Sequence, residues 1–470
     1  MPRRRAALLP LALPAAAALG GCGWLTPAAT TSGIVLPERL RAADAAVPAV
    51  WPDPAWWRGF GSPELDALMA RAVAANFDIA AAAARVRQAD AQVRIVGAAL
   101  LPAVDLGAQA VRQQSALVGT GNFARRRVFA SNNLSLSAAY EIDFWGKNRA
   151  NLEAAQRVAL ANRFDVGTVA LTTEASVGNT YFALLAAQEQ LAIQRANLDI
   201  ATRVLRVIRE RFGVGTGTGL ELAQQETIAA QQRALVPPLQ QQVEQNRNSL
   251  GLLVALPPER LAVEGGGFNR LKIPPVAPGL PAEVLVRRPD VLFAEANLAA
   301  ANANVVVARA QLLPSITLTG SGGFQSVVFE NLLRPGSTIF SLAAGLTQPI
   351  FRGGALRGQV RLSEAQAEEL LAAYRAAIIN ALVDTENALV ALRQTTEQER
   401  LQAEAVRTAE RAYAIGEAQL RAGTIDLVAL LTTQQTLFSA RNTLVEARLA
   451  RFQAAVALFR ALGGGWNAPI

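Results

Sequence analysis

The sequence lacks histidine and has a single cysteine, Cys22, in 470 residues. These absences exclude metal sites built on histidine or on several cysteines, internal disulfides, and catalysis by a histidine base. No group of acidic residues stands out as a candidate acid–base pair either. We therefore expect no catalytic residue, no metal, no cofactor and no enzyme activity.

Long hydrophobic runs are also absent beyond the first 22 residues, although hydrophobic residues make up 51% of the chain. No later segment reaches the roughly 18 unbroken apolar residues that indicate a transmembrane helix. The formal net charge is +8, and once Arg3, Arg4 and Arg5 are set aside the small remaining excess is dispersed. We therefore expect no nucleic-acid binding. If this chain crosses a membrane, it does so with β-strands.

Residues 1–21 have the pattern of a signal peptide, with three arginines followed by an apolar segment too short to span a bilayer. The segment Leu19-Gly20-Gly21-Cys22 resembles a lipobox. Cleavage before Cys22 would leave an S-diacylglycerol and an N-acyl group on that residue, which together anchor a protein stably to a membrane. An ordinary secretory signal with a coincidental cysteine is the alternative.

The rest of the chain contains two tandem repeats, at about 60–260 and 280–462. Residues 98–106 correspond to residues 310–318 at an offset of 212, and the same offset relates other landmarks without a gap. A duplication of this length is more typical of rings, arrays and pores than of a single catalytic pocket.

Long helices are predicted in both repeats. Residues 147–212 contain no proline, and apolar residues recur every seven positions, which is typical of a coiled coil. The second repeat keeps a similar frame over 371–420. Each helix of roughly 65 residues would be about 100 Å long. A return helix follows each turn, and Pro237-Pro238 is expected to kink the first one.

Two other segments, about 102–143 and 314–350, alternate apolar and polar residues with period two. Each segment predicts a pair of strands long enough for a transmembrane β-barrel. A half-buried strand in a soluble sheet is the alternative. Four strands alone would leave open edges with unpaired backbone groups, so several chains would have to share one barrel.

Together with the duplication and the lipobox, three short motifs make the chain similar to the TolC-like outer-membrane efflux protein family, in its NodT-type lipoprotein branch. The motifs are Trp57-Arg58-Gly59-Phe60, Arg287-Arg288-Pro289-Asp290 and Ala461-Leu462-Gly463-Gly464-Gly465-Trp466. The resemblance covers about Trp56 to Trp466. It implies a mainly α fold with a transmembrane β part: a long antiparallel coiled-coil helical barrel, plus four strands per chain in a shared 12-stranded β-barrel of a homotrimer.

The same resemblance implies a function. The chain would be the outer-membrane channel of a tripartite multidrug efflux system, lipid-anchored in the cell outer membrane and extending into the periplasm. It would pass small molecules from a periplasmic membrane-fusion adaptor and an inner-membrane pump of the RND type. A coiled-coil structural outer-membrane lipoprotein without channel activity is the alternative.

The helical turns at about 209–222 and 419–431 are expected to be the periplasmic tips. Candidate gate or adaptor-contact residues at these tips are Arg211, Gly215, Glu221, Arg421, Gly423 and Asp426. Members of the family often carry aspartates after the second tip, and here Ala429 and Thr432 stand at the matching positions. Closure of the entrance is therefore expected to rest on the remaining charges.

Several other residues carry structural expectations. Asp78 and Asp290 are expected to cap helices, Arg287 and Arg288 to pair with carboxylates, and Glu153 and Glu174 to be ordinary solvated positions. Trp51, Trp56 and Trp57 are expected to pack the N-terminal segment against the helices, and Gly463–Gly465 to end the last helix.

Overall fold

The computed structural model describes residue 25 and residues 31–43, 48–114 and 128–466. The chain divides into two compact units, each built from segments of both repeats. The first unit comprises 1–33, 85–162 and 294–375, and the second comprises 34–84, 163–293 and 376–470. The two units are described separately below.

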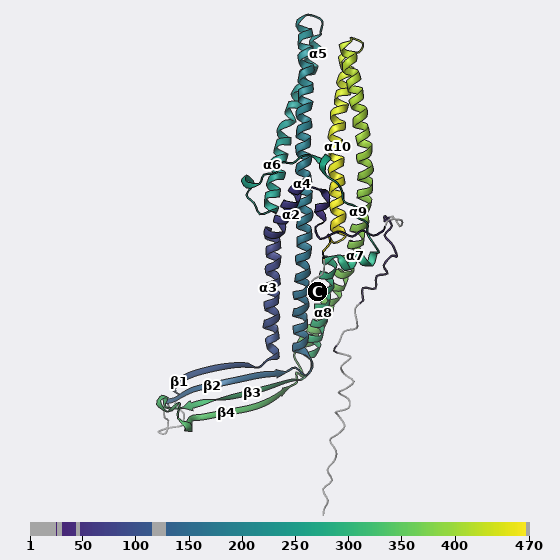
Figure 1. Cartoon of the computed structure of the whole chain (residues 1–470). Coiled ribbons are helices and arrows are strands. Elements are labelled where there is room, and N and C mark those ends of the chain that lie inside the picture. Colours follow the sequence, from purple (N-terminus) through teal and green to yellow (C-terminus); the bar gives the residue numbers. More distant parts are fainter. Residues whose placement is uncertain (1–24, 26–30, 44–47, 115–127, 467–470) are drawn as a thin grey trace, which may run out of the picture. The chain divides into compact units, whose positions relative to one another are not determined.

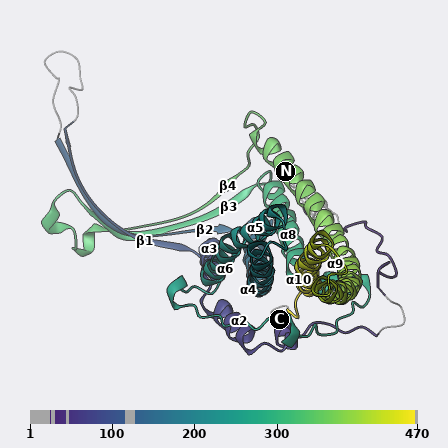
Figure 2. The same ribbon diagram turned by 90° about the horizontal axis from the view of Figure 1, so that it is seen from above.

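The first unit contains a four-stranded antiparallel sheet in the order β1-β2-β3-β4. Its strands are β1 (Ala103–Gln114), β2 (Val128–Ile142), β3 (Ser315–Ser326) and β4 (Thr338–Thr347). The strands lie side by side along a strongly curved sheet (Figure 2). The predicted four strands are therefore confirmed, and a β2–β3 pairing joins the two repeats into one sheet.

Each pair of strands is framed by helices in the same order (Figure 1). In the first repeat α3 (Phe77–Gly97) precedes β1, and α4 (Lys147–Gly213) follows β2. In the second repeat α8 (Pro289–Ala310) precedes β3, and α9 (Ala355–Arg421) follows β4. α4 and α9 each contain 67 residues. They confirm the predicted long helices, each about 100 Å in length.

The return helices differ between the repeats. The second repeat has one continuous helix, α10 (Leu427–Ala461), whereas the first has α5 (Gly219–Ala234) and α6 (Val236–Leu253). Pro237 and Pro238 lie in the first turn of α6, where their rings would clash with the carbonyls of a continuous preceding helix. The return helix is therefore interrupted between α5 and α6, and not only kinked as expected. The buried Gln194 of α4 compensates there, because its side-chain amide Nε2 donates to the backbone carbonyl of Gln232 at 2.8 Å.

The core of the second unit is aromatic. The helical turn η1 (Trp56–Phe60) and α2 (Pro63–Ala75) pack here, and Trp56 stacks on Phe459 of α10 with ring centroids 5.0 Å apart. Trp56 and Trp57 are both buried, so they do pack the N-terminal segment against the helices as expected. The short turns η4 (Pro258–Arg260) and η5 (Phe268–Arg270) and the helix α7 (Pro281–Arg287) complete this unit.

The last helix ends as the glycines predict. α10 stops at Ala461, and Gly463, Gly464 and Gly465 all have positive φ, between 56° and 84°. Only glycine adopts three successive left-handed conformations without strain. A Cβ on Gly465 would lie within 2.5 Å of the Asp53 and Pro54 backbone. The turn therefore also requires a residue without a side chain at this position.

Two helical segments of the described chain are long and apolar enough to cross a membrane by length and composition, 63–100 and 289–310. The first is interrupted at Asn76, where α2 ends and α3 begins. The second is α8, which is an equivalent of α3 in the duplication. Length and composition alone therefore do not show whether helices or strands cross the membrane. The side chains on the two faces of the sheet distinguish these alternatives.

Candidate functional site

The strand register separates the side chains of the sheet into two chemically different faces. The cross-strand row of Leu106, Leu136, Gly322 and Phe340 belongs to one face, and the adjacent row of Asp105, Ser137, Ser321 and Ser341 belongs to the other. The first face continues with Val104, Leu134, Leu318, Leu342 and Leu346, and the second with Gln109, Asn133, Thr319 and Gln325. In the half of the sheet next to the helices, one face is thus apolar and the other polar, whereas both faces are mixed toward the β1–β2 and β3–β4 connections.

The apolar face is not covered by any other part of the described chain. Phe340 is 84% exposed, Leu342 86% and Leu346 70%, whereas side chains of this kind are normally buried in a soluble sheet. An exposed apolar band opposite a polar face is the pattern of a transmembrane barrel wall. This observation favours the membrane strand over the half-buried strand of a soluble protein.

Aromatic side chains mark the end of this band, where the strands meet the helices. Phe144 and Trp145 follow β2 with their rings edge to face at 4.7 Å, and the Trp145 indole donates to the Pro314 carbonyl at 2.8 Å. Phe351 follows β4 and is 87% exposed. Aromatic girdles of this type flank the apolar band of membrane barrels at the lipid–water interface.

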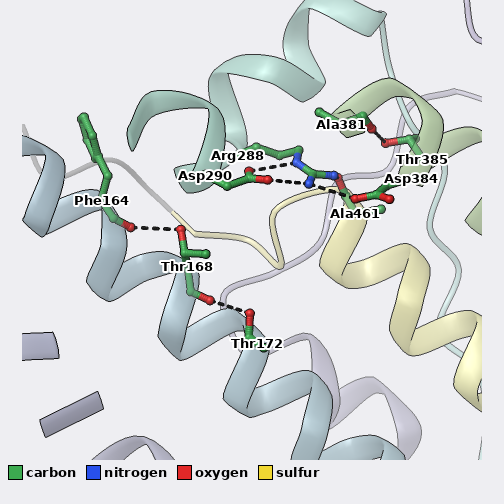
Figure 3. A network of polar contacts seen from close by, with 9 residues as sticks. All are labelled: Phe164, Thr168, Thr172, Arg288, Asp290, Ala381, Asp384, Thr385 and Ala461. Carbon is green, nitrogen blue, oxygen red and sulfur yellow. Dashed lines mark hydrogen bonds and ion pairs between the residues drawn. The ribbon is translucent and has the colours of Figure 1, made fainter. Parts of the chain in front are cut away.

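A clamp centred on Arg288 holds the helices of the second unit together (Figure 3). The Arg288 side chain is nearly buried and lies between two carboxylates, with Nη2 2.7 Å from Asp290 Oδ2 and 3.1 Å from Asp384 Oδ2. Its Nη1 also donates to the Ala461 carbonyl at 3.3 Å. One guanidinium therefore connects the start of α8, the middle of α9 and the end of α10.

Burial alone would lower the pKa of Arg288, but hydrogen bonds and the charges of Asp290 and Asp384 outweigh it and raise that pKa above its usual value. The clamp therefore remains charged. The expected carboxylate partners are confirmed for Arg288. Arg287 instead lies over the Trp51 ring, 4.4 Å from its centroid, which is a cation–π contact.

A pocket of about 200 Å³ adjoins the clamp and is also lined by Arg460, Thr168 and Thr172. The hydroxyls of Thr168 and Thr172 donate to the carbonyls of Phe164 and Thr168 within α4 (Figure 3). Neither hydroxyl proton is therefore available to donate a hydrogen bond to a ligand in the pocket. Among the described residues, no group of three or more acidic or cysteine side chains is placed to hold a metal ion. The Arg288 clamp therefore has a structural role: it holds three helices together.

The first repeat has a neutral counterpart at Asn76, which lies 212 positions before Arg288. Its Nδ2 donates to the carbonyl of Leu253, the last residue of α6, just as Arg288 binds the last residue of α10. Its Oδ1 accepts from the backbone N–H groups of Asp78 and Ile79, at 2.9 and 3.2 Å. Asn76 therefore caps α3.

Two helix-cap predictions are consequently wrong. Asp78 lies inside the first turn of α3, because the preceding asparagine already satisfies the free N–H groups. Asp290 lies inside the first turn of α8, and its carboxylate is taken by Arg288. Both carboxylates still lie at helix N-termini, where the helix dipole favours negative charge.

Glu174 of α4 is not a solvated position, so that expectation is wrong. Burial raises its pKa from 4.5 to about 7, and a hydrogen bond from the Trp56 indole, at 3.3 Å, lowers it only in part. The residues around it include Gly464, Gly465 and Trp466 of the C-terminal turn. Glu153, 21 residues earlier in α4, is exposed and pairs with Arg157 at 3.5 Å, as expected for a solvated residue.

The first helical tip turns between Gly213 and Gly219. The carbonyl of Arg211 accepts from the backbone N–H groups of Thr216 and Gly217, at 2.9 and 3.1 Å, and Gly215 has a φ of 75°. Glu221 forms a capping box with Thr218 at the start of α5. The predicted site residues of this tip therefore have local structural roles within one chain.

The second tip is built in the same way. Gly423 has a φ of 74°, and Asp426 caps α10 by accepting from the Ala429 backbone N–H at 2.8 Å. Arg421 pairs with Glu417 one turn earlier, at 2.6 Å. The Thr432 hydroxyl donates to the Val428 carbonyl within the helix. Neither Ala429 nor Thr432 supplies a carboxylate.

The six predicted tip residues thus gather at two separate turns. Within the described part of one chain, no ion pair connects the two tips. The side chains of Glu221 and Asp426 are both engaged in helix caps, and Glu221 is half-buried whereas Asp426 is exposed. Their role in closing an entrance or contacting an adaptor stays a prediction.

Two features of the helical wall have no signal in the sequence. Glu189 of α4, Arg448 of α10 and Glu399 of α9 form a continuous ion-pair network with distances of 3.0 and 3.4 Å, which Arg451 extends at 2.8 Å. The partners lie between 49 and 259 positions apart, so only the fold brings them together. Asn197, Gln225 and Gln434 are fully buried, and each has amide atoms without a hydrogen-bond partner.

Known proteins resemble this chain over almost its whole length. The model of the family described as "Outer membrane efflux protein" matches residues 68–255 and 280–464. The chain belongs to this family. The matched segments leave out residues 256–279 between the repeats, which include η4 and η5.

Two relatives carry the name "Pyoverdine export outer membrane protein OpmQ". The protein from Pseudomonas putida is 42% identical over 470 residues, covering 99% of this chain and 98% of the relative. The protein from Pseudomonas aeruginosa is 40% identical, covering 96% and 95%. The solved structure of the outer-membrane channel OprN is 26% identical, with a TM-score of 0.88 over 94% of this chain and 99% of that one.

The family and the fold together establish the function class. The chain is a channel component of an efflux system, located in the outer membrane, and it has the fold of TolC-like channels with a helical barrel and a β-barrel. The β-strands are therefore the membrane-crossing elements. Residues 63–100, which include α2 and α3, and residues 289–310 of α8 are long and apolar because these helices are rich in alanine and valine.

Proposed function

We propose that the chain works as a homotrimer in which three four-stranded sheets close into one 12-stranded barrel. The observation that supports this most directly is a sheet with an apolar face, a polar face and two edge strands, β1 and β4, whose outer edges pair with no other strand of the described residues. Unpaired backbone groups cannot be left in hydrocarbon. Pairing β4 of one copy with β1 of the next removes every edge.

The number of copies follows from the size of the lumen. Two copies would give eight strands, and side chains largely fill the interior of an eight-stranded barrel. Three copies give twelve strands, which leave room for a conduit of small molecules. The apolar rows containing Leu342 would then face lipid, and the polar rows containing Ser341 would face the lumen.

We further propose that the helical tips contact a periplasmic adaptor, which connects the channel to an inner-membrane pump of the RND type. Apolar side chains are exposed near both tips, with Val214 75% exposed, Leu220 68% and Val428 56%. Exposed apolar residues rimmed by charges such as Arg211 and Asp426 suit a protein–protein contact. Selection of the cargo belongs to the pump in this arrangement, and the channel has no catalytic role.

We propose a lipid anchor on Cys22, a residue that lies outside the described part of the chain. The position of Ser32 supports it, because Arg375 Nε of α9 donates to the Ser32 carbonyl at 2.7 Å. From Arg375 back to Ala355, where α9 begins, the helix covers about 30 Å. The ten residues from Ser32 back to Cys22 could span at most about 33–36 Å if fully extended. The tether is therefore long enough to bring the acyl groups to the strand–helix boundary.

The cargo class is proposed from the relatives. Because the proteins named for pyoverdine export are 40% and 42% identical over nearly the whole chain, pyoverdine is the first molecule to test. A strain that lacks this gene should retain pyoverdine in its periplasm if the strain makes it. Unchanged secretion, with no compensating homologue present, would exclude this cargo and leave the channel function intact.

The assembly is tested with the purified full-length protein. Native mass spectrometry should give three chains, and planar-bilayer recordings should show a conductance. Cys22→Ser should lose incorporation of labelled palmitate because a hydroxyl cannot form the thioether. A monomer without conductance contradicts the proposed trimer, whereas palmitate labelling of the Cys22→Ser variant contradicts the anchor alone.

A further inference from the structure

The polar face of the sheet carries very little charge. Along the described strands, this face has 24 positions, and only Asp105 and Glu141 among them are charged. Both are acidic. Arg112, the remaining charged residue of the described strands, stands in the alternate register and belongs to the other face. Any charge on the polar face of the described strands therefore comes from these two acids.

One of the two acids is neutralised by a partner. Lys147, in the first turn of α4, places its Nζ 2.6 Å from Glu141 Oε1, and both side chains are about one-third exposed. The pair lies where β2 ends, next to the strand–helix boundary. The field of Glu141 is therefore largely cancelled at short range.

Asp105 has no such partner. Its side chain is exposed, and within the described part of the chain its carboxylate forms no ion pair or hydrogen bond. Across the sheet its row continues through Ser137, Ser321 and Ser341, one hydroxyl from each of the other strands. Asp105 is thus the one uncompensated charge on the polar face of the described strands.

We propose that Asp105 is the residue of the barrel that determines charge selectivity, favouring cations and disfavouring anions. The inference rests on the proposed trimer, in which three Asp105 carboxylates and nine serine hydroxyls share one level of the lumen. Serine hydroxyls solvate ions of either sign, so the carboxylates alone set the preference. Rings of acidic side chains select cations in other channels by the same physics.

The size of the barrel predicts how this preference depends on salt. Twelve strands spaced about 4.8 Å apart and tilted by about 40° give a backbone radius of about 12 Å. The Debye length is about 30 Å at 10 mM salt, 10 Å at 0.1 M and 3 Å at 1 M. At 10 mM the three carboxylates therefore act on the whole cross-section, and at 1 M they act only near the wall.

The test is the reversal potential of the full-length trimer in planar bilayers under a KCl gradient. At about 10 mM salt, Asp105→Asn should lower the K⁺/Cl⁻ permeability ratio by at least roughly threefold, and at 1 M it should change the ratio by less than about 1.5-fold. Arg112→Gln is the matched control, because it also changes one charge per chain but on the apolar face. It should leave the ratio unchanged.

A second variant tests the row itself. Ser341→Asp adds a carboxylate to the same level and should raise the ratio in the wild-type background. In the Asp105→Asn background, it should restore the ratio. A channel whose permeability ratio is the same with and without Asp105, or does not respond to Ser341→Asp, contradicts the inference alone. A wild-type protein without any conductance contradicts the proposed assembly and the inference with it.

Discussion

The buried carboxyl of Glu174 makes the stability of the second unit depend on pH in a specific direction. Burial raises its pKa in the folded chain to about 7, from an ordinary value of 4.5. Because the folded-state value is the higher one, the folded chain binds the proton more tightly than the unfolded chain. This stabilisation is fully present below about pH 4.5 and is lost as the pH rises through about 7.

The linkage relation gives the magnitude. A difference of about 2.5 pKa units corresponds to about 3 kcal/mol per chain between low pH and pH 8, and about 2.5 kcal/mol of that loss falls between pH 5 and pH 8. At roughly 2 °C per kcal/mol for a unit of this size, the contribution to Tm is about 5 °C. Glu174→Gln imitates the protonated carboxyl at every pH and removes this contribution.

The assay is a series of thermal unfolding curves of the detergent-solubilised protein between pH 5 and pH 8, followed by tryptophan fluorescence. The Tm difference between Glu174→Gln and the wild type should be small at pH 5 and should grow by about 5 °C between pH 5 and pH 8. Glu153→Gln, an exposed position on the same helix, should follow the wild-type curve throughout. Parallel curves for Glu174→Gln and the wild type would refute the reasoning.

Other variants test the clamp, the buried amides, the sheet faces and the second tip. Arg288→Ala should cost about 2–4 kcal/mol of unfolding free energy in denaturant titrations, because two carboxylates and a carbonyl lose their partner; Arg288→Lys should recover only part of it. Gln434→Leu should be neutral or stabilising by about 1–2 kcal/mol in the same titrations, since its buried amide has no partner; clear destabilisation would mean that water satisfies the amide. A cysteine at Leu342 should react with lipid-soluble thiol reagents and one at Ser341 with aqueous reagents, and equal labelling would contradict the assignment of the faces. Asp426→Ala should lower Tm slightly, since the cap contributes about 1 kcal/mol. The same variant should raise single-channel conductance if the tip charges close the entrance. Unchanged conductance would mean that Asp426 has only its capping role.

The elements of this fold could be predicted from sequence because their signals are periodic and local. The seven-residue repeat marked α4 and α9, and the alternation marked the strands, both independent of any long-range contact. Proline signals were equally local, although Pro237-Pro238 interrupts the helix more completely than a kink. The turn glycines Gly215 and Gly423 could be placed for the same reason, because a left-handed residue between two helices favours glycine.

Side-chain roles were predicted less well, because they depend on contacts between distant segments. Glu153 and Glu174 are both acidic residues on one helix, and nothing in the local sequence separates them. Only the packing of Trp56 against α4, 118 positions away, buries one of the two. Asp78 lost its predicted cap role to its own neighbour Asn76, a competition that a preference for aspartate at helix starts cannot resolve.

The two repeats show how far a duplication determines function. Both repeats fasten the residue before a helix to the last carbonyl of the return helix, so the geometry of the clamp is shared. The chemistry differs, because Asn76 uses a neutral amide and Arg288 a guanidinium with two carboxylates. The first repeat also interrupts its return helix, whereas the second keeps 35 continuous residues and contributes three of the four members of the ion-pair network. Topology is therefore common to the repeats, while the charged clamp and most of the ion-pair network belong to the second. A role assigned to a residue of one repeat cannot be transferred to its counterpart by position alone; each has to be argued from its own contacts.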